Sequence, residues 1–235
     1  MKSVKMKRVL ILLAVQFICH LLHAQDNTND LAKGKLELGI EGGPNTAYIS
    51  GWTSFIGWRT GLCAGITGQY NINGMFSLKS GIMYEQKGDR LWQESSDTSG
   101  KSTTIILEDK LNYLVVPVFA KVAFGHSLKF FVEAGPWFGY LLDATYTSSI
   151  TNSGSATMNS SRNEISDFHQ ADMGVSAGAG LEMPIKSKFV IDLELRYNQG
   201  LLNADNHTSA YPQALPLPVL TNESIDLLLE LRYRL

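Results

Sequence analysis

The strongest constraint on the fold is an alternation of side-chain character across residues 111–143, LNYLVVPVFAKVAFGHSLKFFVEAGPWFGYLLD. Apolar residues recur at every second position in two long runs, and the segment Gly125-His126-Ser127 separates the runs. A period of two is typical of a β-strand, and two such runs around a short turn predict a β-hairpin. One face of this hairpin is almost wholly apolar, whereas the other carries charge. The fold must therefore accommodate a charged face as well as an apolar one.

Eight segments of the chain show this alternation, and none shows a sustained helical period. Asn73-Gly74 predicts a tight type I′ turn, and the connections at 125–127 and 185–187 are equally short. The other connections are longer and polar. Short turns at one end and long connections at the other are typical of up-and-down membrane barrels. The predicted strands are 35–48, 57–71, 74–88, 105–124, 128–146, 166–184, 188–202 and 222–235.

Sorting each predicted strand by parity separates an apolar face from a charged face. A soluble barrel turns the apolar face inward, whereas a membrane barrel turns it outward into lipid and keeps a polar interior. The charged face is rich in glycine and carries both signs of charge, which suits a narrow lumen filled with ion pairs. Aromatic residues with apolar-face parity cluster near both strand ends, as anchoring at membrane interfaces predicts. We therefore predict an all-β, eight-stranded antiparallel up-and-down transmembrane β-barrel, with a soluble lipocalin-like barrel as the alternative.

The N-terminus predicts export from the cytoplasm. Four basic residues precede a short apolar stretch, and Ala24 stands at the expected cleavage position. We expect a signal peptide at 1–24 and a barrel domain at 25–235. Removing four basic residues from a chain of formal net charge −2 leaves −6, which does not favour nucleic-acid binding. Only Cys63 remains after cleavage, so no intramolecular disulfide is expected.

Several motifs resemble those of a family of small bacterial barrels. Tyr113-Leu114-Val115-Val116-Pro117 with Lys121 resembles the YLxxPxxxK strand of PorT-like outer-membrane β-barrels, although that family often has an acidic residue where Val115 stands. The segment 131–139, FVEAGPWFG, resembles the next strand, and 172–180 and 195–201 resemble late segments. The chain ends in Leu235, where such barrels typically end in an aromatic residue. The resemblance covers about 25–235 and implies an outer-membrane location and an eight-stranded barrel, but no single activity.

The predicted barrel has a definite orientation and a definite interior. An even number of strands puts both termini at the short-turn end, which is periplasmic in such barrels, and leaves the long loops extracellular. An eight-stranded barrel is just wide enough for side chains to fill it. We therefore predict a closed lumen in which buried charges are paired, in preference to a selective pore or a proton path. The candidate ion-pair residues are Lys79, Glu85, Lys121, Glu133, Asp143, Asp172, Asp192, Glu194, Arg196, Glu230 and Arg232.

No pattern in the sequence predicts catalysis, a cofactor or a metal site. Ser166, Asp167 and His169 lie near the long-connection end, where some small membrane barrels carry hydrolase or protease residues. No nucleophile elbow accompanies them, and geometry rather than composition defines such a site. The histidines that follow the signal peptide show no pair at metal-ligand spacing. We therefore expect a non-enzymatic protein without cofactor or metal.

The long connections are the candidate binding surfaces, because long loops on a rigid barrel commonly carry binding functions. Trp92, Phe168 and Tyr211 are the candidate contact residues. We expect a monomer in contact with membrane lipid. It would bind another envelope protein or a surface ligand through 89–104, 147–165 and 203–221. The alternatives are loops that merely face water, a narrow passive pore for small solutes, and a lipid-modifying enzyme.

Overall fold

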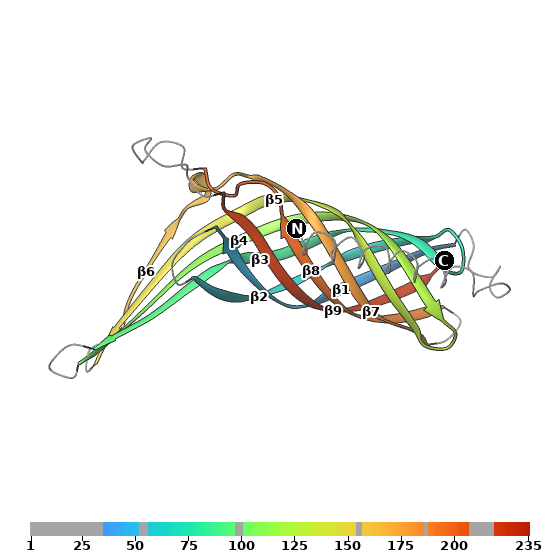
Figure 1. The fold of residues 1–235 in the computed structure, drawn as a ribbon, viewed down its shortest axis with the longest axis horizontal. Coiled ribbons are helices and arrows are strands. Elements are labelled where there is room, and N and C mark those ends of the chain that lie inside the picture. The colour runs from blue at the N-terminus through green and yellow to red at the C-terminus, as the bar shows by residue number, and fades with distance from the viewer. Residues whose placement is uncertain (1–34, 52–55, 97–100, 154–156, 186–187, 207–218) are drawn as a thin grey trace, which may run out of the picture.

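The computed structural model describes residues 35–51, 56–96, 101–153, 157–185, 188–206 and 219–235. The predicted signal peptide and Tyr211 lie outside these residues. The barrel strands are β1 (Lys35–Ser50), β2 (Ile56–Asn71), β3 (Phe76–Ser96), β4 (Ser102–Gly125), β5 (Lys129–Asn152), β7 (Ala171–Pro184), β8 (Phe189–Gly200) and β9 (Thr221–Arg234). Each pairs antiparallel with its neighbours, and β1 pairs with β9 to close the ring (Figure 1). The predicted eight-stranded antiparallel barrel is confirmed.

Three of these strands continue past the barrel and form a projecting sheet. β3 and β4 remain paired as far as Ser96 and Ser102. β5 changes partner along its length: residues 129–140 pair with β7, and residues 145–150 pair with the short strand β6 (Met158–Asn163). A 3-10 turn, η2 (Ile165–Asp167), then returns the chain to the barrel. We call the projecting sheet the arm; it consists of residues 89–96, 102–110, 144–152 and 158–163 (Figure 1).

The arm corrects the prediction that 89–104 and 147–165 are long loops. Both segments are strands over much of their length. The sequence STTIIL at 102–107 and TYTSSIT at 145–151 is rich in β-branched residues, which favour a pleated strand even where both faces meet water. A hairpin can therefore continue as a ladder after its apolar face ends. The polar residues of these segments indicate that the segments are exposed to water, but they do not indicate irregular structure.

The short turns lie at the end opposite the arm, where the described ends of β1 and β9 also lie (Figure 1). Gly125 begins the turn after β4 with φ of 122°, a left-handed conformation that glycine adopts readily. The predicted type I′ turn at Asn73-Gly74 is wrong, because that turn requires positive φ at both residues and Gly74 does not have it. Instead, Asn73 Oδ1 accepts hydrogen bonds from the backbone N–H groups of Met75 and Phe76.

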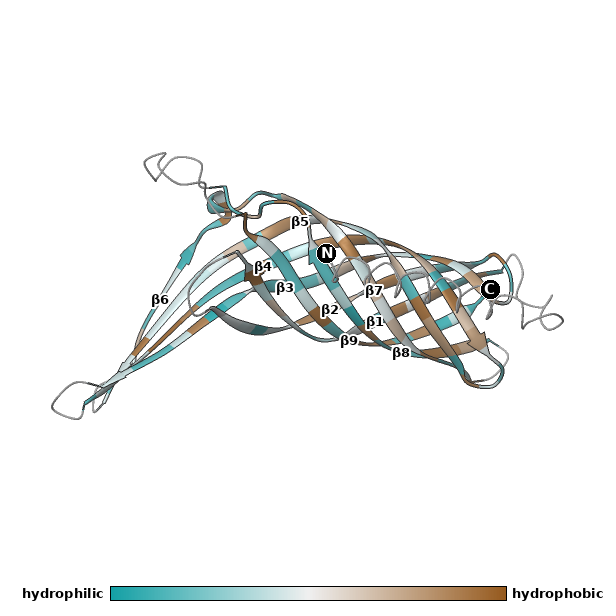
Figure 2. Ribbon diagram, in the orientation of Figure 1, coloured by the Kyte–Doolittle hydropathy of each residue, from teal (hydrophilic) through white to brown (hydrophobic). Residues whose placement is uncertain are grey.

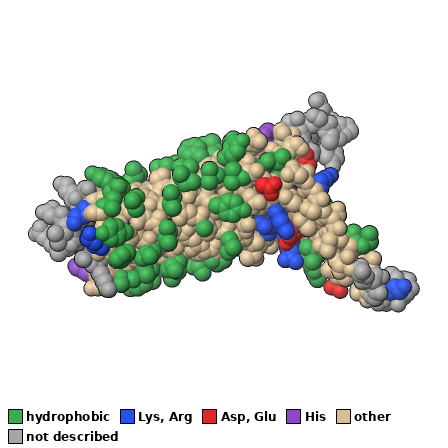
Figure 3. Space-filling view, turned by 180° about the vertical axis from the view of Figure 1, so that it is seen from behind, with side chains coloured by type: hydrophobic (Ala, Val, Ile, Leu, Met, Phe, Trp, Pro, Cys, Tyr) green, Lys and Arg blue, Asp and Glu red, His purple; other side chains and the backbone are tan. Residues whose placement is uncertain are grey.

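Strand parity puts the apolar side chains on the outside of the barrel. Leu38 is 51% exposed and Ile40 is 63% exposed, whereas Arg232 is completely buried in the interior. Figure 2 shows the alternation along the strands, and Figure 3 shows apolar side chains spread over the barrel wall. On that face, charged side chains gather at the base of the arm and at the short-turn end (Figure 3). No helix in the described ranges has the length and hydropathy needed to cross a membrane.

Candidate functional site: the barrel interior

The interior of the barrel contains two sections that follow one another along its axis. A section of ion-paired side chains occupies the part toward the short-turn end. A section of packed apolar side chains occupies the part toward the arm. We call them the charged section and the plug. On β1, β3, β4 and β5 the inward face supplies charged side chains toward the short-turn end and apolar side chains toward the arm.

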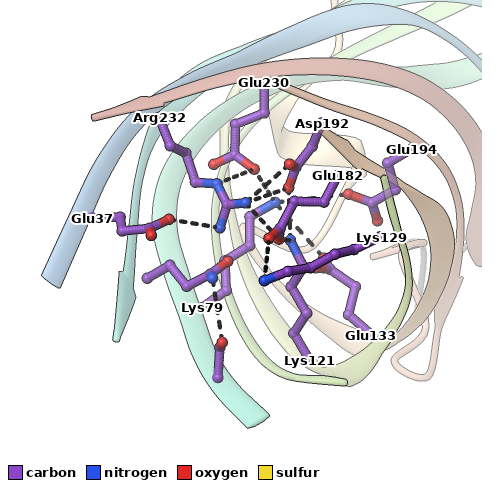
Figure 4. A network of polar contacts seen from close by, with 12 residues as sticks. Glu37, Lys79, Lys121, Lys129, Glu133, Glu182, Asp192, Glu194, Glu230 and Arg232 are labelled. Atoms are coloured by element: carbon purple, nitrogen blue, oxygen red, sulfur yellow. Dashed lines mark hydrogen bonds and ion pairs between the residues drawn. The ribbon is translucent and has the colours of Figure 1, made fainter. Parts of the chain in front are cut away.

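Arg232 of β9 is the basic centre of the charged section nearest the short-turn end (Figure 4). Its guanidinium lies 2.8 Å from Glu182, 2.9 Å from Asp192 and 3.2 Å from Glu37. Lys121 of β4 contacts two of the same carboxylates, with Nζ 3.1 Å from Glu182 and 2.6 Å from Asp192. Glu182 and Asp192 stand directly opposite each other in the register of β7 and β8. Side chains from five strands thus converge on one set of ion pairs.

Lys79 and Arg196 form a second basic centre, beside the first. Lys79 Nζ lies 2.5 Å from Glu41, and Arg196 Nη1 lies 3.0 Å from the same carboxylate. Arg196 Nη2 contacts Glu194 at 2.8 Å and Glu133 at 3.2 Å. All five side chains are almost fully buried. Because an unpaired buried charge is costly, this interior is stable only while the cations and carboxylates stay matched.

Aromatic rings fill the space that the charged groups leave. Lys121 Nζ lies 3.8 Å from the centroid of the Phe131 ring, and the Arg196 guanidinium lies 4.8 Å from that of Phe119. These distances are typical of cation–π contacts. A cavity at the short-turn mouth, lined by Glu37 and Lys129 among others, has a volume of about 20 Å³. That volume suits about one water molecule and not a passage for solutes.

The plug closes the interior toward the arm. Trp137 is its largest member, and a Cβ added at Gly174 would lie 2.6 Å from the indole ring, so glycine is needed there. Lys87 joins the two sections, because its Nζ lies 3.7 Å from the Trp137 ring centroid and 3.3 Å from Glu85. The plug consists of Ile49, Met83, Leu111, Tyr113, Val115, Trp137, Leu141, Ala144 and Leu220, with Ile165 and Phe168 packed against it.

A family model described as an outer membrane protein beta-barrel domain matches residues 23–206, which is most of the chain. The chain belongs to this outer-membrane β-barrel family. Membership implies a location in the bacterial outer membrane, where the apolar barrel wall faces lipid. The membrane barrel is therefore favoured over the lipocalin-like alternative both by the family and by the outward apolar face.

Several solved structures are similar to this outer-membrane barrel. Neisserial surface protein A is 15% identical with a TM-score of 0.43, and the match covers 84% of this chain and 96% of that one. The attachment invasion locus protein Ail of Yersinia pestis is 13% identical with a TM-score of 0.41, covering 86% and 99%. OprG from Pseudomonas aeruginosa is 8% identical with a TM-score of 0.42, covering 87% and 98%. No curated protein matches the chain.

The structure brings most of the predicted lumen residues together. Nine of them take part in ion pairs with one another or with neighbouring lumen residues: Lys79, Glu85, Lys121, Glu133, Asp192, Glu194, Arg196, Glu230 and Arg232. Asp172 is buried but makes hydrogen bonds only, including one from Asn222 Nδ2 at 2.8 Å. The lumen is thus ion-paired over the charged section and not along its whole length.

The prediction that Asp143 belongs to the ion-paired lumen residues is wrong. The register of β4 and β5 shifts at Asn112, so that Leu141 and Ala144 both face the interior and Asp143 between them is partly exposed. Its carboxylate accepts hydrogen bonds from Asn112 and Thr145. A β-bulge inserts one residue and reverses parity beyond it. No residue in this stretch marks the bulge in the sequence, which is why parity counting failed there.

The predicted contact residues have different surroundings. Trp92 lies on the arm and is 58% exposed. Phe168 packs against the plug and forms an isolated bridge with Asp205, so it is partly buried and not a projecting contact. Ser166 donates a hydrogen bond to Asp167 at 3.2 Å. No group of His, Cys, Asp and Glu suited to a metal ion occurs among the described residues.

Sequence reasoning missed the plug, although its signal was present. Met83, Tyr113, Val115 and Trp137 all have interior parity and lie toward the arm end of their strands. Parity sorting had grouped them with the charged face because charges dominate that face as a whole. Recording position along the strand, as well as parity, would have separated the two sections.

A cluster of carboxyl groups lies at the base of the arm, beyond the membrane-facing wall. Asp89 and Asp109 stand opposite each other in the register of β3 and β4, and Glu164 contacts Asp109. Burial, together with the neighbouring Asp109, raises the pKa of Asp89 to about 7. Burial, together with Glu164, raises the pKa of Asp109 to about 6. This cluster therefore holds a proton close to neutral pH.

Proposed function

We propose that this protein is a non-conducting outer-membrane barrel that displays the arm to a partner outside the cell. The closed interior carries this proposal. Ion pairs around Arg232 and Lys79 fill one section, and the packed side chains around Trp137 fill the next. A solute would have to displace both. The resemblance to PorT-like barrels, which implies no single activity, supports an accessory role.

The proposed orientation puts the short-turn end and both chain ends in the periplasm. The expected export signal and the usual asymmetry of outer-membrane barrels support it, since short turns are periplasmic and long connections extracellular. Accessibility labelling of intact cells tests this orientation. A cysteine at Ser160 on the arm is expected to react with an impermeant reagent, and one at Ser127 in a short turn is expected to react only after permeabilisation. The reverse pattern would contradict it.

The arm supports partner binding by its exposed strand edge. Among the strands that the structure describes, β6 pairs only with β5, and all six of its residues are exposed. The other side of such an edge strand presents backbone N–H and C=O groups that an incoming extended segment can pair with. Trp92 and Ile106 stand opposite each other and supply an apolar contact on the same sheet. The proposed partner is an envelope protein or a surface ligand with an extended polypeptide segment.

Crosslinking in intact cells tests the role of the arm. A photo-reactive residue at Ser160 is expected to capture one defined partner. Replacing residues 93–105 and residues 149–159 each by an Asn-Gly turn trims the arm in matched register, because Trp92 pairs with Ile106 and Ser148 with Ser160. We expect the adduct to disappear while heat-dependent gel mobility shows an intact barrel.

Trp92→Ala is expected to weaken capture of the partner, and Trp58→Ala at the barrel wall is the matched control. Capture by the trimmed protein would overturn the proposal.

A narrow passive pore for small solutes is the second candidate, and the small cavity at the short-turn mouth would have to extend through both sections for a solute to pass. Current recording across planar bilayers distinguishes the two. We propose that the protein has no catalytic role. Lipid mass spectrometry of cells that carry Asp167→Ala and His169→Ala tests this proposal. A change in lipid composition in those variants would favour a lipid-modifying enzyme instead.

A further inference from the structure

The barrel interior contains more acids than bases. Two partly exposed bases at the short-turn mouth, Lys129 and Arg234, contact the lumen carboxylates Glu182 and Glu37. Even with these two, eight bases face ten carboxyl groups among the described lumen residues, so at least two carboxyls lack a balancing charge. The buried acids are Glu37, Glu41, Glu85, Glu133, Asp172, Glu182, Asp192, Glu194, Asp226 and Glu230, and the buried bases are Arg59, Lys79, Lys87, Lys121, Arg196 and Arg232.

Two of the ten carboxyl groups have no basic nitrogen within ion-pair distance in the described part of the chain. Asp226 of β9 is 1% exposed; one carboxyl oxygen accepts a hydrogen bond from Asn198 Nδ2 at 2.6 Å, and the other, Oδ1, has no hydrogen-bond partner. Asp172 of β7 accepts its side-chain hydrogen bond from Asn222 Nδ2 at 2.8 Å. The remaining eight each lie within 4.0 Å of a lysine or arginine nitrogen. The excess of two acids over the bases therefore equals the number of carboxyl groups that make no ion pair with a described base, which are Asp172 and Asp226.

The surroundings of these two carboxyls do not supply another counter-charge. Both face the ion pair of Lys87 and Glu85, in which the lysine is already matched. Arg196, opposite Asp226 in the register, points instead to Glu41, Glu133 and Glu194. The other groups that face the two carboxyls are neutral and comprise Asn45 of β1, Cys63 of β2, Tyr113 of β4, Asn198 of β8 and Asn222 of β9.

A bound proton is the simplest counter-charge. An isolated buried carboxylate carries a large desolvation penalty, and such groups become neutral instead. A metal ion would need converging ligands, and the described residues contain no group suited to one. We infer that Asp172 and Asp226 are proton-binding sites and remain neutral carboxylic acids in the folded barrel at neutral pH. Asn222 Oδ1, buried without a partner, supplies an acceptor beside Asp172 once its amide is rotated.

Protonation of the two aspartates makes folding of the barrel pH-dependent whether or not the arm binds a partner. In an unfolded chain both aspartates are ionised at neutral pH. The folded barrel therefore binds two protons that unfolding releases, so its stability decreases as the pH rises from about 4 until the two folded aspartates ionise. Replacing either aspartate by asparagine reproduces the neutral form with nearly the same shape. The same replacement at Asp192, which lies 2.6 Å from Lys121, instead removes a paired charge.

Infrared spectroscopy of the full chain, folded in micelles of a detergent without ester or carboxyl groups at neutral pH, tests the inference. The wild type is expected to show the carbonyl band of protonated carboxylic acids, shifted in D2O. Asp226→Asn and Asp172→Asn are each expected to remove part of this band, and Asp192→Asn is expected to leave it unchanged. Absence of the band from the wild type would overturn the inference, as would a band that neither asparagine variant diminishes.

Thermal unfolding of the same proteins gives an independent readout. Asp226→Asn and Asp172→Asn are each expected to raise the Tm at neutral pH, because the asparagine does not have to bind a proton on folding, and to reduce the fall in Tm between acidic and alkaline pH. Asp192→Asn is expected to lower the Tm at both pH values. If Asp226→Asn lowers the neutral-pH Tm as much as Asp192→Asn does, Asp226 is an ionised, stabilising carboxylate and the inference is wrong.

Discussion

The charged section and the plug close the same lumen by different physics. In the charged section, Arg232, Lys121, Lys79 and Arg196 each contact two or more carboxylates, so removing one of them leaves buried carboxylates with less positive charge than they need. In the plug, apolar side chains contribute through packed volume, so a truncation leaves a cavity whose cost depends on how far the neighbours relax. One barrel interior therefore combines two kinds of section. The stability of the charged section depends on single charges, and the stability of the plug depends on the volume of its side chains.

Of the substitutions that distinguish the two sections, Arg232→Ala is expected to cause the largest loss of stability. The change leaves Glu182, Asp192 and Glu37 without their shared cation. We expect the free energy of unfolding in vesicles to fall by about 3–5 kcal/mol. Urea titration followed by heat-dependent gel mobility measures this loss. Arg90→Ala, a partly exposed arginine on the arm, is the control and should cost no more than about 1 kcal/mol. Equal losses for the two variants would contradict the account.

Leu111→Ala tests the plug and is expected to cost somewhat less. Leu111 is fully buried beside Tyr113 and Trp137, so the truncation should reduce the free energy of unfolding by about 3 kcal/mol. Leu229→Ala removes the same atoms from the lipid-facing wall, where Leu229 is 57% exposed, and is the matched control. Urea unfolding of both variants in the same vesicles gives the comparison. A smaller loss at Leu111 than at Leu229 would show that the plug is not closely packed.

The smallest expected effect is a pH dependence at the base of the arm. The pKa values of Asp89 and Asp109, about 7 and about 6, lie above that of an unfolded aspartate. The folded cluster thus holds protons that the unfolded chain releases, so its stabilisation is complete below about pH 4 and is lost as the pH rises to about 7. Hydrogen exchange of amides 145–150, corrected for intrinsic rates, should show less protection at pH 8 than at pH 5.

Two variants sharpen this pH test. Asp89→Asn is expected to flatten the pH dependence of protection, because its amide cannot ionise. Glu108→Gln, one position from Asp109 and on the opposite face of the arm, is expected to leave the dependence unchanged. An unaltered dependence in Asp89→Asn would exclude this carboxyl cluster as its origin.

The sequence predicted the barrel well because strand parity reports which environment each face meets. The eight alternating segments led to the strand number, and the glycine-rich charged face together with the aromatic residues at both strand ends led to the outward apolar face. Parity counting failed at Asp143, where a bulge reverses the faces, and polarity misled at 89–104, where strands continue into water. The identity of ion-pair partners, such as Lys121 with Asp192, depends on register between strands distant in sequence, which one strand's pattern does not contain.

We propose that the charged section and the plug close the lumen independently of each other, and current recording in planar bilayers tests this closure. The wild type, Lys121→Ala in the charged section and Trp137→Ala in the plug are each expected to give no conductance steps, because one section stays closed in every case. The double variant is expected to conduct if it still inserts. Reproducible steps from the wild type, or from either single variant, would contradict the account.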